Sequence, residues 1–492
     1  MPTLGLELCD AGLVAAIASA TETKLLPVAD QQGINDWPGF AYHENGNFLY
    51  GRAAEDMWFV HPRRVTHTFW SKLTHESVST LNVTGRPPSF SELSFFFLRE
   101  YSRRLASVGP TAEKVVLAVP GAYLKDAATE EEKIGLLLGM ASELKLPLAG
   151  LMDMACAAMC DPRAPGFNPA LPVIVADVHQ EGTDLTLLVA EERLERKQFF
   201  HLPNAGYAQL LKHLTATMGN RFLRHTAFDI LEDGRVDQMF FRQTKDFLIG
   251  GSAEFRYQIN TATRNYELVA KHEQLVHDAQ AFVTTLVHGL QSFVEQAGHA
   301  PGLCSIALTA RTTGIPGLEA KLRAAGFTRL LRLPAGAAAA GAARVGATRL
   351  SVAADLADVS VEHSVPLADT RRTAAAAWEV RLQKARPASP RPAPTHAIFE
   401  GVGHPLGHGA RFTVGAAATR ADLTLPETFS SDDCAVPLVR DGGRLWFIDS
   451  GQRGEAAARV PVEAGDRLTL RTGAVTAEVL FAHCPGTNGA HA

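Results

Sequence analysis

The sequence has few cysteines, no long hydrophobic run and no marked excess of charge of either sign. Its six cysteines are spread over 492 residues without a Cys-x-x-Cys pair, so neither a disulfide framework nor a paired-cysteine metal site is indicated. No run of 18 or more apolar residues occurs, so we expect no membrane span. A net charge of -5 gives no reason to expect a nucleic acid partner.

The first residues also lack the basic region that precedes the apolar stretch of a signal peptide. We therefore expect a cytoplasmic protein with free thiols. Hydrophobic residues make up 46% and charged residues 20% of the chain, which is the composition of a globular protein. One domain takes roughly 100–200 residues, so this length predicts about three to four structural units.

Apolar runs and turn residues along the first 350 residues predict an α/β protein. The expected elements are a strand–turn–strand at 4–19, a helix at 91–106, a buried strand at 114–119, a helix at 126–144, two strands at 172–192, a mostly helical region at 205–300, and a strand, loop and helix at 305–326. The small residues of 333–347 predict a helix that packs closely against its neighbours.

The composition changes after Gly346. Residues 351–396 are rich in Ala, Pro and basic side chains and have no hydrophobic period, which predicts a linker. Residues 397–485 contain short alternating strands separated by Gly and Asp, a pattern typical of a small all-β sandwich. Residues 486–492 are expected to form a tail.

The opening stretch LGLELCDAGLVAAI resembles the first phosphate loop of the heat shock protein 70 (DnaK-type) nucleotide-binding domain, a member of the actin-like ATPase superfamily. Glu7 stands where the family has an aspartate, and Cys9-Asp10-Ala11 replaces Gly-Thr-Thr. The resemblance implies that Glu7, Asp10 and Gly12 contact the nucleotide. Phosphate loops need bare amides, whereas Asp10 would place a carboxylate near a phosphate, where like charges repel.

Two further segments resemble the family's catalytic positions. GRAAEDMWFVHPRRVTHTFWSKL places Lys72 at the lysine that lies near the γ-phosphate, although an ordinary surface lysine fits the sequence equally well. AVPGAYLKDAATEEEKIGLLLGMASELKLPLAGLMDMACAAMC resembles the first connecting segment and puts Asp153 where the family has a glutamate. With Asp177 from the next loop, these residues are the implied catalytic set.

The stretch IVADVHQEGTDLTLL resembles the family's second phosphate loop. Asp177 and Asp184 keep the family's seven-residue spacing, and Gly182 and Thr183 lie between them. The family's glycines are replaced by three side chains that begin at His179. The resemblance implies that Gly182, Thr183 and Asp184 contact the nucleotide. His179 is open to two interpretations, as a new ligand or base or as an ordinary loop residue.

Two last segments complete the resemblance. IALTARTTGIPGLEAKL resembles the adenosine-binding loop, with Ala310 and Arg311 in place of a Gly-Gly pair. Arg311 would either occupy the space of the adenosine or stack on its base. AGAAAAGAARVGA resembles the second connecting helix, with Gly336 as a nucleotide-contacting glycine.

The six segments follow the family's order across residues 4–347. They imply a two-lobed actin-like ATPase (ribonuclease H-like) fold over residues 1–350, with lobe I at about 1–170 and lobe II at about 171–350. The family's substrate-binding β-domain and helical lid have no counterpart.

The C-terminal region resembles a forkhead-associated domain in PLGHGARFTVGAAATRADLTLP and in the block around SSDDC. The family's phosphothreonine-binding arginine is missing, since Ala416 follows Val414-Gly415. Ser431 is retained and Arg420 offers a replacement guanidinium. A structural or protein-binding sandwich is the alternative.

Together these features predict a non-catalytic or weakly active scaffold or assembly factor that binds protein partners through its C-terminal sandwich, with no cofactor and no metal. The main alternative is an active ATP hydrolase, a chaperone-like switch. Mg-ATP or Mg-ADP would then lie between the lobes, and Glu7, Lys72, Asp153 and Asp177 would polarise the phosphates and the attacking water. A metabolite kinase and a filament-forming protein remain further classes on the same fold.

Overall fold

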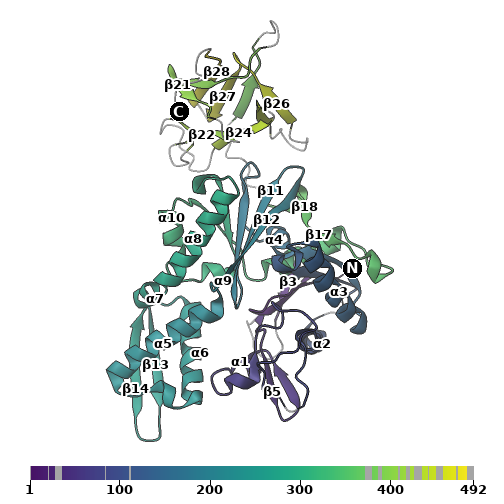
Figure 1. The fold of residues 1–492 in the computed structure, drawn as a ribbon, viewed down its shortest axis with the longest axis vertical. Coiled ribbons are helices and arrows are strands. Elements are labelled where there is room, and N and C mark those ends of the chain that lie inside the picture. Colours follow the sequence, from purple (N-terminus) through teal and green to yellow (C-terminus); the bar gives the residue numbers. More distant parts are fainter. Residues whose placement is uncertain are drawn as a thin grey trace.

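The computed structural model describes most of the chain as a mixed α/β protein with a C-terminal all-β region (Figure 1). The described residues are 2–19, 22–27, 36–83, 85–109, 112–371, 379–385, 391–407, 411–416, 421–425, 435–441, 443–449, 458–472 and 475–484. Eleven α-helices lie within them. None of the helices in this part of the chain combines the length and the apolar character that crossing a membrane requires.

The first lobe is built on a sheet with the strand order β17–β9–β8–β1–β2–β3, and β4 pairs with β2. β1 is antiparallel to β2, as the strand–turn–strand pattern predicts, and is parallel to β8. The apolar run of β8 is buried beyond its first residue, which fits its central place in the sheet. The bounds are β1 Thr3–Glu7, β2 Leu13–Ala18, β3 Thr23–Leu26, β4 Asp36–Trp37, β8 Lys114–Val119, β9 Leu148–Asp153 and β17 Val361–Glu362.

Helices cover both faces of this sheet. α2 and α3, both predicted from the sequence, share an apolar core with Leu6 and Leu117 on one face. α4 and α11 pack on the other face, against Val116 and Ala118, which alternate with Leu117 along β8. The bounds are α2 Phe90–Val108, α3 Ala127–Glu143, α4 Met154–Met159 and α11 Ala337–Thr348.

The small residues of α11 allow very close packing, as predicted. A Cβ atom added to Gly5 of β1 would lie 2.1 Å from the Ala339 carbonyl oxygen, and one added to Gly341 would lie 1.7 Å from that of Ala157. Any side chain at either glycine would therefore push α11 away from the first sheet and from α4.

The second lobe repeats the topology of the first. Its sheet has the order β16–β15–β10–β11–β12–β18. β10, β11 and β12 are successively antiparallel, and β10, β15 and β16 are parallel, which matches β1, β2, β3 and β1, β8, β9 in the first lobe. The bounds are β10 Val173–Val178, β11 Gly182–Ala190, β12 Arg193–Pro203, β15 Ser305–Leu308, β16 Arg329–Arg332 and β18 Ser364–Pro366.

The helical prediction for 205–300 is right for most of that region and wrong for 254–271, which form the hairpin β13–β14. Tyr257 and Ile259 are buried while their neighbours are exposed, a period of two that specifies a strand. The bounds are α5 Tyr207–Thr226, α6 Gly234–Gly250, β13 Glu254–Asn260, β14 Asn265–Lys271, α7 His272–Asp278, α8 Gln280–Gln296, α9 Ala310–Thr313 and α10 Leu318–Ala324.

A small sheet, β6–β5–β7, and helix α1 extend from the first lobe and meet α6 of the second lobe (Figure 1). Phe40, Tyr42 and Trp58 from this extension belong to the same apolar core as Phe240 and Phe241 of α6. The two lobes are therefore joined by a shared core at this end. The bounds are β5 Ala41–Glu44, β6 Asn47–Tyr50, α1 Arg52–Glu55 and β7 Val65–Thr66.

Residues 351–396 were predicted as a linker. Among the described residues of this range, the short strands β17, β18 and β19 pair with sheets on either side. β17 pairs with β9, β18 with β12, and β19 with β27 of the C-terminal region. Strands of two to five residues carry too few apolar positions to give a visible hydrophobic period.

The C-terminal region consists of two five-stranded sheets, β19–β27–β28–β20–β21 and β23–β22–β24–β25–β26. Side chains of both sheets, among them Phe412, Phe447 and Phe481, share one apolar core. The bounds are β19 Glu379–Gln383, β20 His396–Phe399, β21 Val402–Pro405, β22 Arg411–Ala416, β23 Leu423–Leu425, β24 Ala435–Asp441, β25 Arg444–Asp449, β26 Ala458–Val462, β27 Arg467–Thr472 and β28 Val475–Ala482. The predicted tail lies outside the described residues.

Candidate functional site

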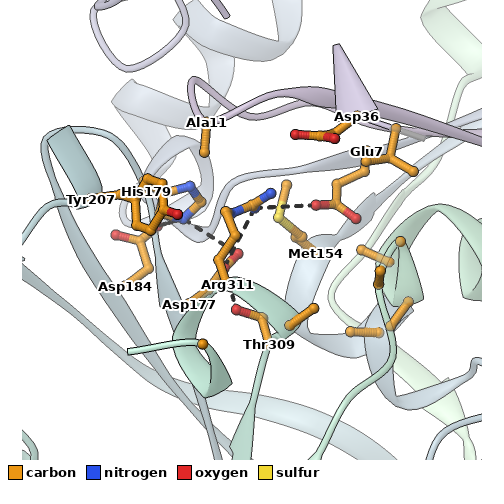
Figure 2. Close-up of a pocket in the computed structure, with 18 of the residues that line it drawn as sticks. Glu7, Ala11, Asp36, Met154, Asp177, His179, Asp184, Tyr207, Thr309 and Arg311 are labelled. Atoms are coloured by element: carbon orange, nitrogen blue, oxygen red, sulfur yellow. Dashed lines mark hydrogen bonds and ion pairs between the residues drawn. The ribbon is translucent and has the colours of Figure 1, made fainter. Parts of the chain in front are cut away.

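A cavity of about 350 Å³ lies between the two lobes (Figure 2). Glu7 at the end of β1 and Asp36 of β4 line it from the first lobe. Asp177 of β10 and Arg311 of α9 line it from the second lobe, and Gly336 lines it at the start of α11. Residues of the two segments that resemble phosphate loops and of the segment that resembles the adenosine-binding loop therefore line one cavity, although they are far apart in the sequence.

The Arg311 side chain crosses from the second lobe to the first. Its Nη2 lies 3.3 Å from Glu7 Oε1 and 3.6 Å from Asp177 Oδ1, and its Nε donates a hydrogen bond to the Val178 carbonyl at 3.3 Å (Figure 2). Burial opposes the guanidinium charge, but the anionic groups around it outweigh burial and raise the pKa of Arg311. Arg311 is thus a fixed positive charge in the middle of the cleft.

Glu7 and Asp177, the two carboxylates next to the Arg311 guanidinium, are both buried. Burial raises the pKa of Glu7, and the Arg311 charge counteracts the rise only in part. Asp177 Oδ1 also accepts a hydrogen bond from the Thr309 hydroxyl at 2.9 Å. The Arg311 guanidinium therefore compensates two carboxylates, one from each lobe.

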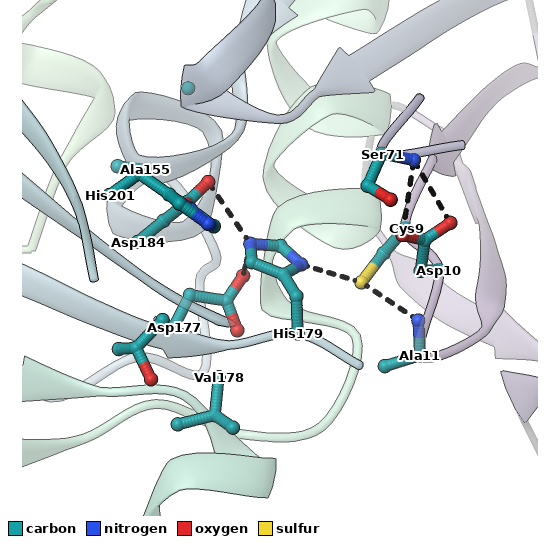
Figure 3. Close-up of polar contacts among 12 residues, drawn as sticks. Cys9, Asp10, Ala11, Ser71, Ala155, Asp177, Val178, His179, Asp184 and His201 are labelled. Carbon is teal, nitrogen blue, oxygen red and sulfur yellow. Dashed lines mark hydrogen bonds and ion pairs between the residues drawn. The ribbon is translucent and has the colours of Figure 1, made fainter. Parts of the chain in front are cut away.

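His179 forms a second cluster of buried charges in the same cleft (Figure 3). Its Nδ1 lies 2.9 Å from Cys9 Sγ of the first lobe, and its Nε2 lies 3.3 Å from Asp184 Oδ2 and 3.5 Å from Asp177 Oδ2. Burial disfavours the charged imidazole, but the negative charges around it outweigh burial and raise the pKa of His179. The other oxygen of Asp184 lies 2.7 Å from Nδ1 of His201.

Asp184 is held as a carboxylate by these two histidines. Burial alone would raise the pKa of Asp184, but His179 and His201 lower it to about 2. In the loop His179-Gln180-Glu181, the His179 side chain thus places an imidazole where the heat shock protein 70 family has bare backbone amides.

Asp10 occupies the turn after β1 and satisfies backbone amides of the neighbouring segment. Its Oδ1 accepts hydrogen bonds from the N–H groups of Trp70 and Ser71, at 2.9 and 3.0 Å (Figure 3). Burial raises the pKa of Asp10 to about 6, and the hydrogen bonds from Ser71 counteract the rise. Asp10 is therefore an anion bound by consecutive amides, the kind of contact that a phosphate group makes elsewhere.

Some of the glycines and small residues of the implied nucleotide site line the cavity, and the others do not. Ala310 and Gly336 line the cavity, and Gly336 has the left-handed φ of 65°. Thr183 donates a hydrogen bond to the Ala205 carbonyl at 2.6 Å. A Cβ atom at Gly182 would lie 2.6 Å from the His201 ring, so this glycine leaves room for a histidine. Gly12, in the β1–β2 turn, would place a Cβ atom 3.3 Å from Asp36.

Lys72 and Asp153 are placed away from the cavity lining. Lys72 is exposed, and its Nζ lies 5.9 Å from the centre of the Phe90 ring. Asp153 is buried and caps α4 by accepting hydrogen bonds from the amides of Ala155 and Cys156. Arg196 Nη1 lies 3.2 Å from the other carboxylate oxygen of Asp153. Both oxygens of Asp153 are therefore already engaged.

Sequence reasoning missed the pairing of Cys9 with His179 and the contribution of His201. Cys9 and His179 are 170 positions apart, and neither lies in a pattern that indicates a partner. The available signal was the replacement of glycines by side chains in both phosphate loops. This replacement indicates that side chains enter the cleft. It does not identify which of them contact one another.

Contacts of α1 and of the residues after it with α6 also join the two lobes. Lys245 Nζ lies 2.5 Å from Glu55 Oε1, and both side chains are largely buried. The Phe59 amide donates a hydrogen bond to Gln238 Oε1 at 3.0 Å. The Trp58 ring packs edge-on against Phe241, with centroids 5.4 Å apart. These contacts join the extension of the first lobe to α6 of the second lobe.

Among the described residues, no group of three or more His, Cys, Asp or Glu side chains has the arrangement of a metal site. The candidate phosphopeptide residues Arg420 and Ser431 lie outside the described residues. No protein-family model matches the chain, and no curated protein matches it significantly.

Proposed function

We propose that residues 1–350 form an actin-like, DnaK-type ATPase fold whose nucleotide cleft is closed by its own side chains, and that the protein is a nucleotide-independent scaffold or assembly factor. The observation that carries the proposal is Arg311. Its guanidinium lies in the cleft and bridges Glu7 of one lobe and Asp177 of the other. Protein partners would bind through the C-terminal β-region.

The repeated topology supports the actin-like fold. Two sheets with three antiparallel strands followed by two parallel strands face one cavity, and five of the six resembling segments contribute residues to its lining. In open α/β sheets, ligands bind at the carboxyl ends of the parallel strands. Glu7 and Asp177 stand at these ends in the two lobes.

The residues in the cleft do not fit a triphosphate. Phosphate binding in this position would need free backbone amides and glycines. Asp10 already accepts hydrogen bonds from the amides of Trp70 and Ser71, and His179 stands in the second loop. The buried carboxylates Glu7, Asp177 and Asp184 would repel the phosphates, and Arg311 and His179 already compensate them.

The closed end of the cleft supports the same proposal. A switch needs lobes that separate and close again around a ligand. Here Trp58 and Phe241 share a core across the lobes, and the Lys245–Glu55 pair is buried between them. Opening the cleft at this end would expose the shared apolar core to water, which works against repeated opening.

The remaining cavity favours one second candidate, the ATP-dependent switch. A volume of about 350 Å³ lies within the range of small-molecule sites, and Ala310 and Gly336, two residues implied to contact the nucleotide, line it. In that case the Arg311 side chain would have to leave the cleft when the nucleotide binds.

An ATPase assay of the full chain tests the proposal. The wild type and the variants Lys72→Ala and Asp177→Asn should release phosphate at the same background rate. A rate above background that both substitutions abolish would contradict the proposal and establish the switch. Partner binding is tested separately, by comparing the proteins that copurify with the full chain and with a chain ending at Arg371.

A further inference from the structure

The wall of the interlobe cavity carries polar side chains that make no hydrogen bond within the described part of the chain. The Asp36 carboxylate and the Tyr207 hydroxyl are two of them (Figure 2). The Gln180 side-chain amide is the third, although only 4% of this residue is exposed. Buried polar groups in folded proteins are nearly always hydrogen-bonded, so the missing partner of these groups belongs in the cavity.

The balance of charge around the cavity indicates that this partner is a cation. Among the described residues, four carboxylates line the cavity, those of Glu7, Asp36, Asp177 and Asp184. Lys245 also lines it, but its ammonium group is paired with Glu55. Even with His179 protonated, only His179 and Arg311 then remain to balance the four carboxylates. Asp36 is the carboxylate that neither of them contacts.

Glu7 and Asp36 lie on opposite sides of Val14 in the first sheet. Val14 of β2 pairs with Glu7 of β1 and also with Asp36 of β4. Side chains of directly paired residues emerge on the same face of a sheet, and all three of these residues line the cavity. The first lobe therefore offers the cavity an aliphatic floor with a carboxylate on either side.

The ionisation of Glu7 reflects the same shortage of positive charge. Burial raises the pKa of Glu7, and the Asp177 carboxylate adds to the rise, whereas Arg311 lowers the pKa only in part. A cation bound beside Glu7 would stabilise its ionised form. The described residues include no metal-type cluster of three His, Cys, Asp or Glu side chains, which favours an organic cation.

The opposite wall of the cavity is apolar. Two helices form it, with Met154, Ala155 and Ala158 from α4 and Ala337 and Ala338 from α11. Carboxylates on one wall and small apolar side chains on the other suit a molecule with one cationic end and a short hydrocarbon chain. The volume of about 350 Å³ is near the lower limit of small-molecule sites, so the ligand is small.

We propose that the interlobe cavity binds a small primary aliphatic amine, with its ammonium group between Glu7 and Asp36 and its hydrocarbon chain against α4 and α11. An ammonium group carries three N–H donors and no acceptor, which matches carboxylates that need donors. An anionic ligand would instead be repelled by the same two carboxylates. The inference rests on the proposed function, since the amine takes space in a cleft that is closed to nucleotide.

Calorimetric titration of the full chain with n-butylamine at pH 7 tests the inference. The amine is protonated at this pH, as a lysine side chain is. We expect a saturable heat and a rise of the unfolding temperature at millimolar n-butylamine. 1-Butanol and sodium butyrate, which carry the same chain with a neutral or an anionic end, should give neither. No heat with n-butylamine, or equal binding of 1-butanol, would overturn the inference.

Two carboxylate variants locate the binding site. Asp36→Asn should weaken n-butylamine binding about tenfold, because a charge-assisted hydrogen bond is replaced by a neutral one. Its unfolding temperature without amine should stay near that of the wild type, which shows that the variant is folded. Asp56→Asn removes a carboxylate that pairs with Arg242 and lies outside the lining of this cavity, so it should bind the amine like the wild type. Equal affinities of the two variants would overturn the inference.

A titration with Mg-ATP on the same sample separates this inference from the proposed function. Binding of both Mg-ATP and n-butylamine would contradict the closed cleft and support the amine site. Binding of neither would support the closed cleft and overturn the amine site. Binding of n-butylamine alone is the result that we expect.

Discussion

At the scale of single residues, Arg311 has the largest expected effect on stability. Arg311→Ala would leave the buried Glu7 and Asp177 carboxylates without their cationic partner. We expect a loss of about 3 kcal/mol in the free energy of unfolding, measured by urea denaturation. Arg242→Ala breaks an exposed pair with Asp56 and is the matched control, with an expected loss of at most about 1 kcal/mol. Equal losses in the two variants would refute the role assigned to Arg311.

His67 should make the protein sensitive to mild acid. Burial and the Lys212 charge lower its pKa to about 4, although Glu181 Oε1 lies 3.2 Å from Nδ1. An unfolded histidine has a pKa near 6.5, so the unfolded chain binds more protons between the two values. The stability contributed by neutral His67 is therefore present above pH 6.5 and is lost as the pH falls toward 4.

The variant His67→Gln tests this effect. Between pH 6.5 and pH 5, the wild type should lose about 1–2 kcal/mol more of its free energy of unfolding than the variant does. Urea denaturation at both pH values gives the comparison. Parallel losses in the two proteins would show that His67 does not titrate in this range.

Several residues that the resemblance assigns to one site line one cavity, and the reason is local. Glu7 ends a strand, and Asp177 and Asp184 flank one turn, so their places follow from the order of the strands. Lys72 does not line the cavity, because a side chain in a loop takes its direction from packing that the sequence does not reveal. The Cys9–His179 contact joins two loops 170 positions apart and had no local signal.

At the scale of secondary structure, the packing of α1 against α6 determines whether the cleft can open. Phe241→Ala would remove a fully buried ring from the core that the two lobes share, at a cost of about 3–5 kcal/mol. It should also speed amide hydrogen exchange in α1 and α6. Met239→Ala, on a more exposed position of the same helix, should change stability by less than about 1 kcal/mol. Faster exchange in α5 alone would contradict the closure that we describe.

Helices and strands with a strong hydrophobic period or a clear helix cap were predictable. Elements without such a signal were missed. α2 begins at a capping box of Ser89 and Glu92, and α3 begins at the cap Asp126. The hairpin β13–β14 lies between two amphipathic helices and exposes one face, so only Tyr257 and Ile259 signal its period. The short strands β17 and β18 have no such signal at all.

At the scale of the whole molecule, the two lobes share one topology and one cavity, while the C-terminal β-region has an apolar core of its own. The division into an α/β part and an all-β part was predictable from the change of composition near residue 350. The proposed closed state of the cleft could not be predicted from the composition, because it depends on side chains from both lobes that meet at one point.

The most direct test of the closed cleft is calorimetric titration of the reduced full chain with Mg-ATP and Mg-ADP, with thermal unfolding in the same solutions. We expect no heat of binding and no shift of the unfolding temperature at millimolar nucleotide, because in the proposed closed cleft Arg311 and His179 already compensate the buried carboxylates. A ligand present at a hundredfold excess over its dissociation constant would stabilise the native state by about 2.7 kcal/mol. A clear heat of binding with a shift of that size would show that the cleft opens for nucleotide and would contradict the proposed scaffold.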